Sequence, residues 1–168
     1  MSPDAIVLTA IVLGTVLASA VDLRTRRVPN VVTMSLAATG VLIAFAGLGR
    51  VGLVASLLGL GLGVALMLPG HLFGGTGAGD VKLFAAVGAF LGPAGILSAF
   101  LYTAVAGGVL AVVIAIRRGR ARQTIGAAAH LVVSGAANRD AVEHPSANNR
   151  FAYAPAIAIG AVLAAIAY

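Results

Sequence analysis

Apolar residues form long runs along this chain, separated by short polar links. The runs cover residues 4–21, 31–48, 51–69, 81–116 and 151–168. At 1.5 Å per residue, a helix of about 18 residues is about 27 Å long, close to the apolar thickness of a bilayer. The pattern therefore predicts an all-α protein that crosses a membrane several times.

The run at residues 81–116 is about twice as long as its neighbours. As one straight helix it would extend about 54 Å, which is too long for a single crossing. Gly92-Pro93 is the natural turning point. With a turn there, the sequence predicts a bundle of six transmembrane helices, with spans at about 4–21, 31–48, 51–69, 81–92, 95–116 and 151–168.

Positive charge supports this turn and sets the orientation. Of the 11 Lys and Arg residues, all except Arg50 then lie on one side of the membrane, including every arginine of residues 117–150. Basic loops tend to remain in the cytoplasm. We therefore expect a multi-pass protein of the inner (cytoplasmic) membrane with both termini outside. The basic residues follow the first run rather than precede it, which favours a retained span over a signal peptide.

Composition narrows the class of protein. Hydrophobic residues make up 60% of the 168 residues and charged residues 10%, with a mean hydropathy of +1.05, which is typical of an integral membrane protein. The net charge is +6. Because the basic residues lie in the links between apolar runs, this charge does not indicate a nucleic-acid partner. The absence of cysteine excludes disulfides and Cys-ligated zinc.

We expect a single membrane-embedded domain over residues 1–168, with a cytoplasmic loop at 117–150. An apolar patch in that loop, residues 125–133, favours a short helix at the membrane surface.

Two aspartates stand at the ends of apolar runs. Asp22 follows the first run, and Asp80 precedes the fourth, behind the glycine-rich stretch 74–79. Two crossings separate them, so they share one face of the membrane in either orientation. Taken singly, Asp80 is explained by helix capping and Asp22 by a juxtamembrane charge. Taken together, two acids beside membrane spans indicate a functional site.

Paired carboxyl groups favour one particular chemistry. If the two groups meet, mutual repulsion and partial burial keep one protonated while the other is ionised. The ionised group then takes a proton from a water that attacks a peptide carbonyl, while the protonated group hydrogen-bonds the carbonyl oxygen and supplies a proton. No metal or cofactor is needed. A small carrier or channel component for cations or protons is the alternative, although its acids would lie near the bilayer midplane. A scaffold without chemistry is the third possibility.

The segments around both acids resemble those of the type IV prepilin peptidases, which are membrane aspartic proteases with a Gly-X-Gly-Asp motif. The stretch Gly77-Ala78-Gly79-Asp80-Val81-Lys82-Leu83 is similar to the second catalytic block of that family. Asp22 with Arg24 and then Val28-Pro29-Asn30 is similar to the first block. The stretch from Tyr153 to Ala158 is similar to the last span of the family, so the resemblance covers about residues 4–168.

The resemblance implies a catalytic pair, Asp22 and Asp80, and a set of supporting residues: Gly77, Gly79, Lys82, Pro29 and Asn30. It implies pilin-like precursors as substrates, cut on the cytoplasmic side of their leader peptides. Larger members also methylate the new N-terminus and carry a cysteine-bearing N-terminal extension. This chain has neither the cysteines nor the extension. We therefore expect a peptidase without the methyltransferase domain, similar to the short forms that serve Flp or tight-adherence pili. Archaeal-type flagellins or other leader-bearing membrane proteins are related candidate substrates.

Lys82 and the glycines of the motif have competing interpretations. Lys82 lies close enough to Asp80 along the chain to tune that acid or to contact the substrate. Long cationic side chains at the ends of spans more commonly extend to the membrane interface. Gly77 and Gly79 favour a tight turn over a phosphate-binding loop, because neither the required Lys-Ser or Lys-Thr nor a preceding strand is present.

Three histidines, His71, His130 and His144, share the predicted cytoplasmic side with the two acids. Their spacing matches no metal-ligand motif, so we expect no metal site. The expected partners are the precursor substrate and membrane lipid.

Overall fold

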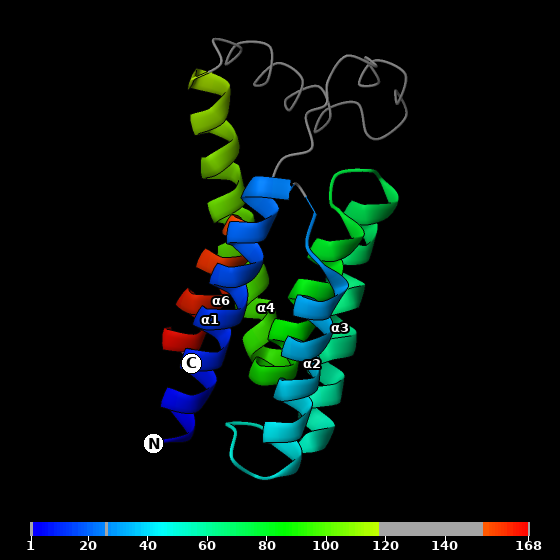
Figure 1. Ribbon diagram of the computed structural model, residues 1–168, viewed down its shortest axis with the longest axis vertical. Coiled ribbons are helices and arrows are strands. Elements are labelled where there is room, and N and C mark those ends of the chain that lie inside the picture. The colour runs from blue at the N-terminus through cyan, green and yellow to red at the C-terminus, as the bar shows by residue number, and fades with distance from the viewer. Residues whose placement is uncertain (1, 26, 118–152, 168) are drawn as a thin grey trace. The chain divides into compact units, whose positions relative to one another are not determined.

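The computed structural model describes residues 2–25, 27–117 and 153–167. Its helices are α1 (Pro3–Thr25), α2 (Asn30–Phe45), α3 (Leu53–Leu72), α4 (Ala78–Arg117) and α6 (Ala154–Ala167) (Figure 1). The described residues within 1–107 and 153–167 form one compact unit, and residues 108–117 belong to a second. The described residues contain no strand, which confirms the all-α prediction for them. Residues 118–150 of the predicted loop, including its apolar patch, lie outside the described residues.

Helix length and composition identify a membrane protein. Among the described residues, α1, α3 and α4 are long and apolar enough to cross a membrane. Helices α2 and α6 are also apolar but shorter, with 16 and 14 residues. Large apolar side chains remain exposed on several helices, for example Leu13, Val31 and Phe45. Such surfaces suit the hydrocarbon of a bilayer rather than water.

Helix α4 is interrupted at Gly92, whose φ of 68° and ψ of −174° lie outside the helical region. Glycine adopts this positive φ at little cost, and Pro93 has no backbone N–H to donate. The rings of Phe84 and Phe100 lie on either side of the break, yet their centroids are 6.2 Å apart in an edge-to-face arrangement. A straight helix would separate these residues by about 24 Å. The chain therefore reverses direction at Gly92, which agrees with the turn predicted from the sequence.

The stretches predicted as separate helices at 81–92 and 95–116 are the two arms of α4, which meet at the break in helical geometry at Gly92. The structure joins both stretches in α4, so the described chain has five helices, of which three meet the length expected of a span. The physical reason is that no loop intervenes. Gly92 changes the direction of the chain by itself, and Pro93 suits the first turn of the helix that resumes.

The first stretch of α4 is the core of the larger unit, and nearly all of residues 80–92 are buried. Small residues let neighbouring helices approach it closely. A β-carbon added to Gly63 of α3 would lie 2.8 Å from the Ala85 Cα, and one added to Gly40 of α2 would lie 2.9 Å from the Ala89 Cβ. Ser56 of α3 donates a hydrogen bond to the Ala89 carbonyl at 2.7 Å. Both α2 and α3 thus pack directly on α4.

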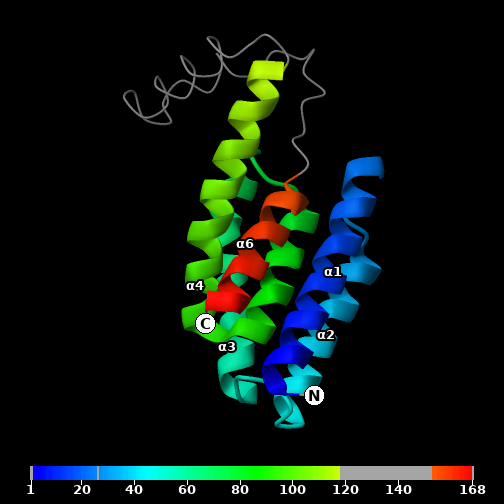
Figure 2. The ribbon, with the colours of Figure 1, turned by 90° about the vertical axis from the view of Figure 1, so that its left-hand side faces the viewer.

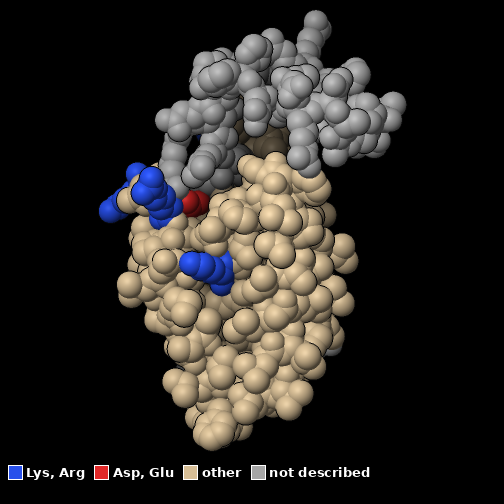
Figure 3. Space-filling model, turned by 90° about the vertical axis from the view of Figure 1, so that its right-hand side faces the viewer, with Lys and Arg blue, Asp and Glu red and all other residues tan. Residues whose placement is uncertain are grey.

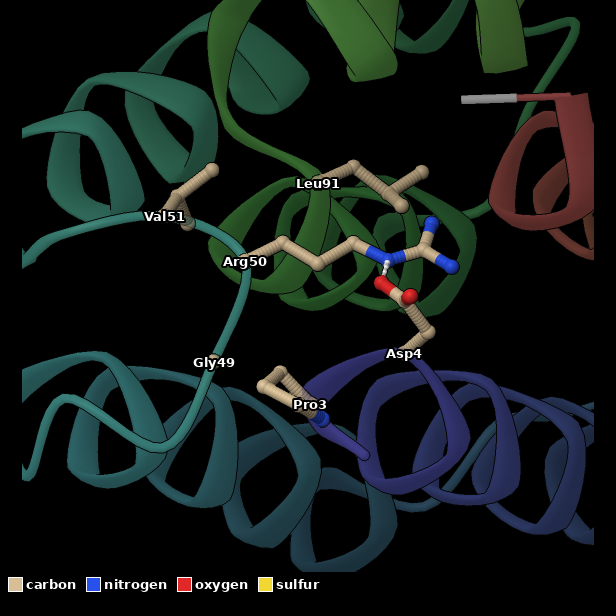
Figure 4. Close-up of a pocket in the computed structure, with 6 residues that line it drawn as sticks. All are labelled: Pro3, Asp4, Gly49, Arg50, Val51 and Leu91. Atoms are coloured by element: carbon tan, nitrogen blue, oxygen red, sulfur yellow. Dashed lines mark hydrogen bonds and ion pairs between the residues drawn. The ribbon is translucent and has the colours of Figure 1, made fainter. Parts of the chain in front are cut away.

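Helix α1 packs along α6 and α2 (Figure 2). The loop between α2 and α3 contacts both α1 and α6 at the end of the unit where α1 begins. There Arg50 Nε donates to Asp4 Oδ1 at 2.6 Å, and Arg50 Nη1 donates to the Ala165 carbonyl at 2.6 Å. Arg50 therefore links the first turn of α1 to the last turn of α6. A pocket of about 410 Å³ surrounds this ion pair (Figure 4). Its lining residues are Pro3, Asp4, Gly49, Arg50, Val51 and Leu91.

Candidate active site

Asp22 lies in the last turn of α1. The sequence predicts a span that stops at residue 21, but the helix continues to Thr25, so Asp22 lies inside it and only 5% of its surface is exposed. The backbone N–H of Ala154, the first residue of α6, donates a hydrogen bond to the Asp22 carboxylate. Asp22 Oδ2 is buried and has no hydrogen-bond partner within the described chain.

Asp80 lies in the first turn of α4 and is 6% exposed. Its Oδ2 accepts a hydrogen bond from the Gly77 N–H at 3.0 Å, while the Gly77 carbonyl accepts from the N–H groups of Asp80 and Val81 at 3.0 and 3.2 Å. The Asp80 side chain thus caps the N-terminus of α4 from the third position of the helix, as the acidic residue of a capping box does. Capping occupies one carboxylate oxygen only, because Asp80 Oδ1 is buried without a partner among the described residues.

The structure brings the two acids together. Asp22 ends α1 and Asp80 begins α4 at the same end of the larger unit (Figure 1), and the charge of Asp22 acts on Asp80. Each carboxyl group thus has one oxygen held by a backbone N–H and a second, buried oxygen that no described residue satisfies. Leaving a buried polar atom unsatisfied costs about 1–3 kcal/mol. Native proteins rarely retain such atoms without a functional reason.

The supporting residues of the motif surround the start of α4. Gly79 lies against the link between α1 and α2, because a β-carbon placed on it would lie 2.9 Å from the Val28 Cβ and 3.2 Å from the Val28 carbonyl oxygen. Pro29 caps α2 in an extended conformation (φ −64°, ψ 139°). The absence of a side chain at Gly79 thus lets the link that follows Asp22 lie directly on the helix that carries Asp80.

Lys82 is exposed and donates a hydrogen bond from Nζ to Asn30 Oδ1 at 2.9 Å. This contact joins the first turn of α4 to the first turn of α2. It gives Lys82 and Asn30 a shared structural role beside the acids that the sequence alone did not indicate.

Tyr153 is a further residue of this region. It immediately precedes α6, and a β-carbon on Gly107 of α4 would lie 2.9 Å from its ring and 3.1 Å from its hydroxyl oxygen. Burial, and to a lesser degree the negative charge of Asp80, raise the pKa of the Tyr153 phenol. Sequence reasoning gave Tyr153 no role of its own. The available signal was a phenol directly before the last apolar run.

Basic side chains gather at the same end as the acids. Arg24, Arg27 and Lys82 are all exposed, and Figure 3 shows Lys and Arg side chains beside acidic atoms at one end of a face that is otherwise without charge. A charged end next to an uncharged surface is what a membrane-water boundary requires.

Of the three histidines, only His71 lies among the described residues. His71 lies in the last turn of α3, and its Nδ1 is 3.0 Å from the carbonyl oxygen of Thr76 in the loop that precedes α4. His130 and His144 lie outside the described residues. No group of three or more potential metal ligands occurs among the residues that the structure describes.

The geometry is suited to acid–base chemistry on a bound polar group. Two buried carboxyl groups that each keep an unsatisfied oxygen can exchange protons with a bound polar group, one accepting a proton and the other donating one. Because both groups lie in terminal turns of helices rather than at helix centres, the site belongs near the boundary of the apolar layer.

Comparison with protein families supports this interpretation. The model of a family described as the type IV leader peptidase family matches residues 7–112. The matched stretch is more than half of the 168 residues and includes both acids and the link between α1 and α2. Comparison with curated proteins and with solved structures gave no match. The family resemblance found in the sequence is confirmed, and the chain belongs to the type IV leader peptidase family.

Proposed function

We propose that this membrane peptidase is an aspartic endopeptidase whose catalytic residues are Asp22 and Asp80. The observation that supports the proposal most strongly is the pair of unsatisfied, buried carboxylate oxygens, one at the end of α1 and one at the start of α4. Family membership supplies the reaction class, which is peptide hydrolysis. The two acids supply a means of carrying it out without a metal.

In the proposed mechanism the ionised carboxylate removes a proton from a water as the water oxygen attacks the carbonyl carbon of the scissile amide. The protonated acid donates its proton to the carbonyl oxygen, which gives a neutral tetrahedral diol. When the diol collapses, the C–N bond breaks and the leaving nitrogen takes up the proton that the first carboxylate had accepted. A proton from a diol hydroxyl returns to the second carboxylate, so one water is consumed and the dyad is restored.

We further propose that the chain crosses the membrane six times. Helix α4 reverses at Gly92, so it supplies two passes in addition to those of the other four helices. Helices α2 and α6 span about 24 and 21 Å, a deficit that local thinning of the bilayer accommodates. With Arg24, Arg27 and Lys82 on the cytoplasmic side, Asp22 and Asp80 face the cytoplasm at the inner membrane, and both termini lie outside.

The proposed substrates are pilin-like precursors. Such a precursor carries a short basic leader followed by an apolar helix. A site at the membrane boundary suits this design, because the apolar helix can remain in lipid while the scissile bond meets water and the two acids.

The proposal is tested with a model precursor of that design, reconstituted with the full chain in vesicles. Asp22→Asn and Asp80→Asn should each lower the cleavage rate by at least about 10³-fold, with thermal unfolding close to that of the wild type. Asp4→Asn is the matched control, because it makes the same chemical change in α1 at the turn remote from the site. Cleavage that survives in either site variant, or that is lost equally in the Asp4 variant, contradicts the proposal.

A further inference from the structure

Helix α6 lies outside the stretch that matches the family, residues 7–112, yet its first turn reaches both acids. The Ala154 N–H donates to the Asp22 carboxylate, and Tyr153 is close enough to Asp80 for the charge of that acid to act on the phenol. The start of α6 is therefore a third wall of the site, beside the end of α1 and the start of α4.

The position of the Tyr153 ring is set by α4. Gly107 lies against it, and any side chain there would meet the ring edge at 2.9 Å and the hydroxyl oxygen at 3.1 Å. For the next residue, Gly108, no atom of the described residues lies within 4 Å of the place where its β-carbon would be. Only the first of these adjacent glycines thus provides the space that the tyrosine occupies.

The phenol is suited to act as a hydrogen-bond donor. Its pKa is raised by burial and by the charge of Asp80, so it keeps its proton at neutral pH and serves as a hydrogen-bond donor rather than as a base. A neutral donor that lies near Asp80 and is held by packing against Gly107 is suited to an oxygen atom on which negative charge develops.

We propose that the Tyr153 hydroxyl donates a hydrogen bond to the carbonyl oxygen of the scissile amide, alongside the protonated acid of the dyad. This assignment rests on the proposed peptidase function. No proton is transferred from Tyr153. The hydrogen bond strengthens as the carbonyl oxygen gains charge and weakens again when the C–N bond breaks, so it stabilises the transition state more than the bound substrate.

The test compares Tyr153→Phe with Tyr102→Phe in the vesicle assay. Phenylalanine keeps the ring beside Gly107 and removes only the hydroxyl. We expect kcat to fall by about 10- to 100-fold, at or below the lower end of losses seen for single oxyanion donors, with KM nearly unchanged and the midpoints of the pH profile in place. Tyr102, a partly exposed residue of α4, should give wild-type values. Full activity of Tyr153→Phe, or a loss carried by KM, overturns the assignment. A shift of the pH midpoints also overturns the assignment, because such a shift would mean that the Tyr153 hydroxyl hydrogen-bonds to a catalytic acid instead of to the substrate.

A second pair of variants tests the same inference without changing the tyrosine. Gly107→Ala should displace the phenol and lower kcat to a similar degree, whereas Gly108→Ala should leave it unchanged. Equal activity of these two variants contradicts the proposed position of the ring. Failure of the peptidase proposal would look different, because cleavage would then persist in Asp22→Asn or Asp80→Asn, and the assignment of Tyr153 would fail with it.

Discussion

Gly79→Ala is predicted to damage catalysis more than stability. The new methyl group would lie 2.9 Å from the Val28 Cβ and 3.2 Å from the Val28 carbonyl oxygen, whereas ordinary contacts of this kind begin near 3.5 Å. One of the two contacted atoms belongs to the backbone, so a change of rotamer cannot relieve the overlap. The link that follows Asp22 and the helix that carries Asp80 must therefore separate by several tenths of an ångström.

The expected magnitudes follow from two opposing terms. Overpacking costs about 1–3 kcal/mol, while replacing glycine by alanine inside a helix gains about 1 kcal/mol. The net loss of unfolding free energy should thus be at most about 2 kcal/mol. Catalysis depends on the relative position of two acids, and a misplacement of about 1 Å can cost about 10²-fold in rate. We expect the cleavage rate to fall by about 10- to 100-fold in a protein that remains folded.

The assay is single-turnover cleavage of the model precursor, with unfolding measured on the same preparation. Gly61→Ala is the matched control, because no atom lies within 4 Å of its added β-carbon and the same helical gain applies. A Gly79→Ala protein that cleaves at the wild-type rate would refute the idea that this contact sets the geometry of the site.

Two further substitutions test the fold around the site. Arg50→Ala removes the hydrogen bonds that join α1 to α6 and should lower the unfolding free energy by about 1–3 kcal/mol without changing kcat at 25 °C; an unchanged melting temperature would show that the link is dispensable. Gly59→Ala would place its methyl group on the backbone of α4 at Gly88 and Gly92 and should cost about 3 kcal/mol, measured by thermal unfolding beside Gly61→Ala; equal stability of the two variants would contradict the close packing of α3 on α4.

Much of the fold follows from the apolar pattern. Runs of membrane-spanning length predict helices, and the excess length of residues 81–116 predicts the reversal that Gly92 provides. The helix ends were predicted less accurately. Asp22 was expected beyond its helix and instead lies within α1, because a polar residue can extend a helix when another chain segment satisfies it. Here that segment is the N–H of Ala154, which is remote in sequence.

The site was predictable only in part for a similar reason. Because an even number of crossings separates Asp22 from Asp80, the sequence places both acids on one face of the membrane. The structure places them at the same end of the larger unit, where Asp22 influences Asp80 electrostatically. Contacts between segments remote in sequence leave no such pattern. The hydrogen bond of Lys82 to Asn30 and the approach of Tyr153 to Gly107 depend on helix packing, which hydrophobic periodicity does not specify.

The most direct measurement of the central claim compares the single-turnover cleavage rates of Asp22→Asn, Asp80→Asn and the double variant in the same vesicles. Residues that act as one catalytic unit are strongly non-additive. If the two carboxyl groups share a water and a proton, the double variant should be no slower than the slower single variant. Losses that multiply in the double variant would mean that the acids act independently, which would contradict the account.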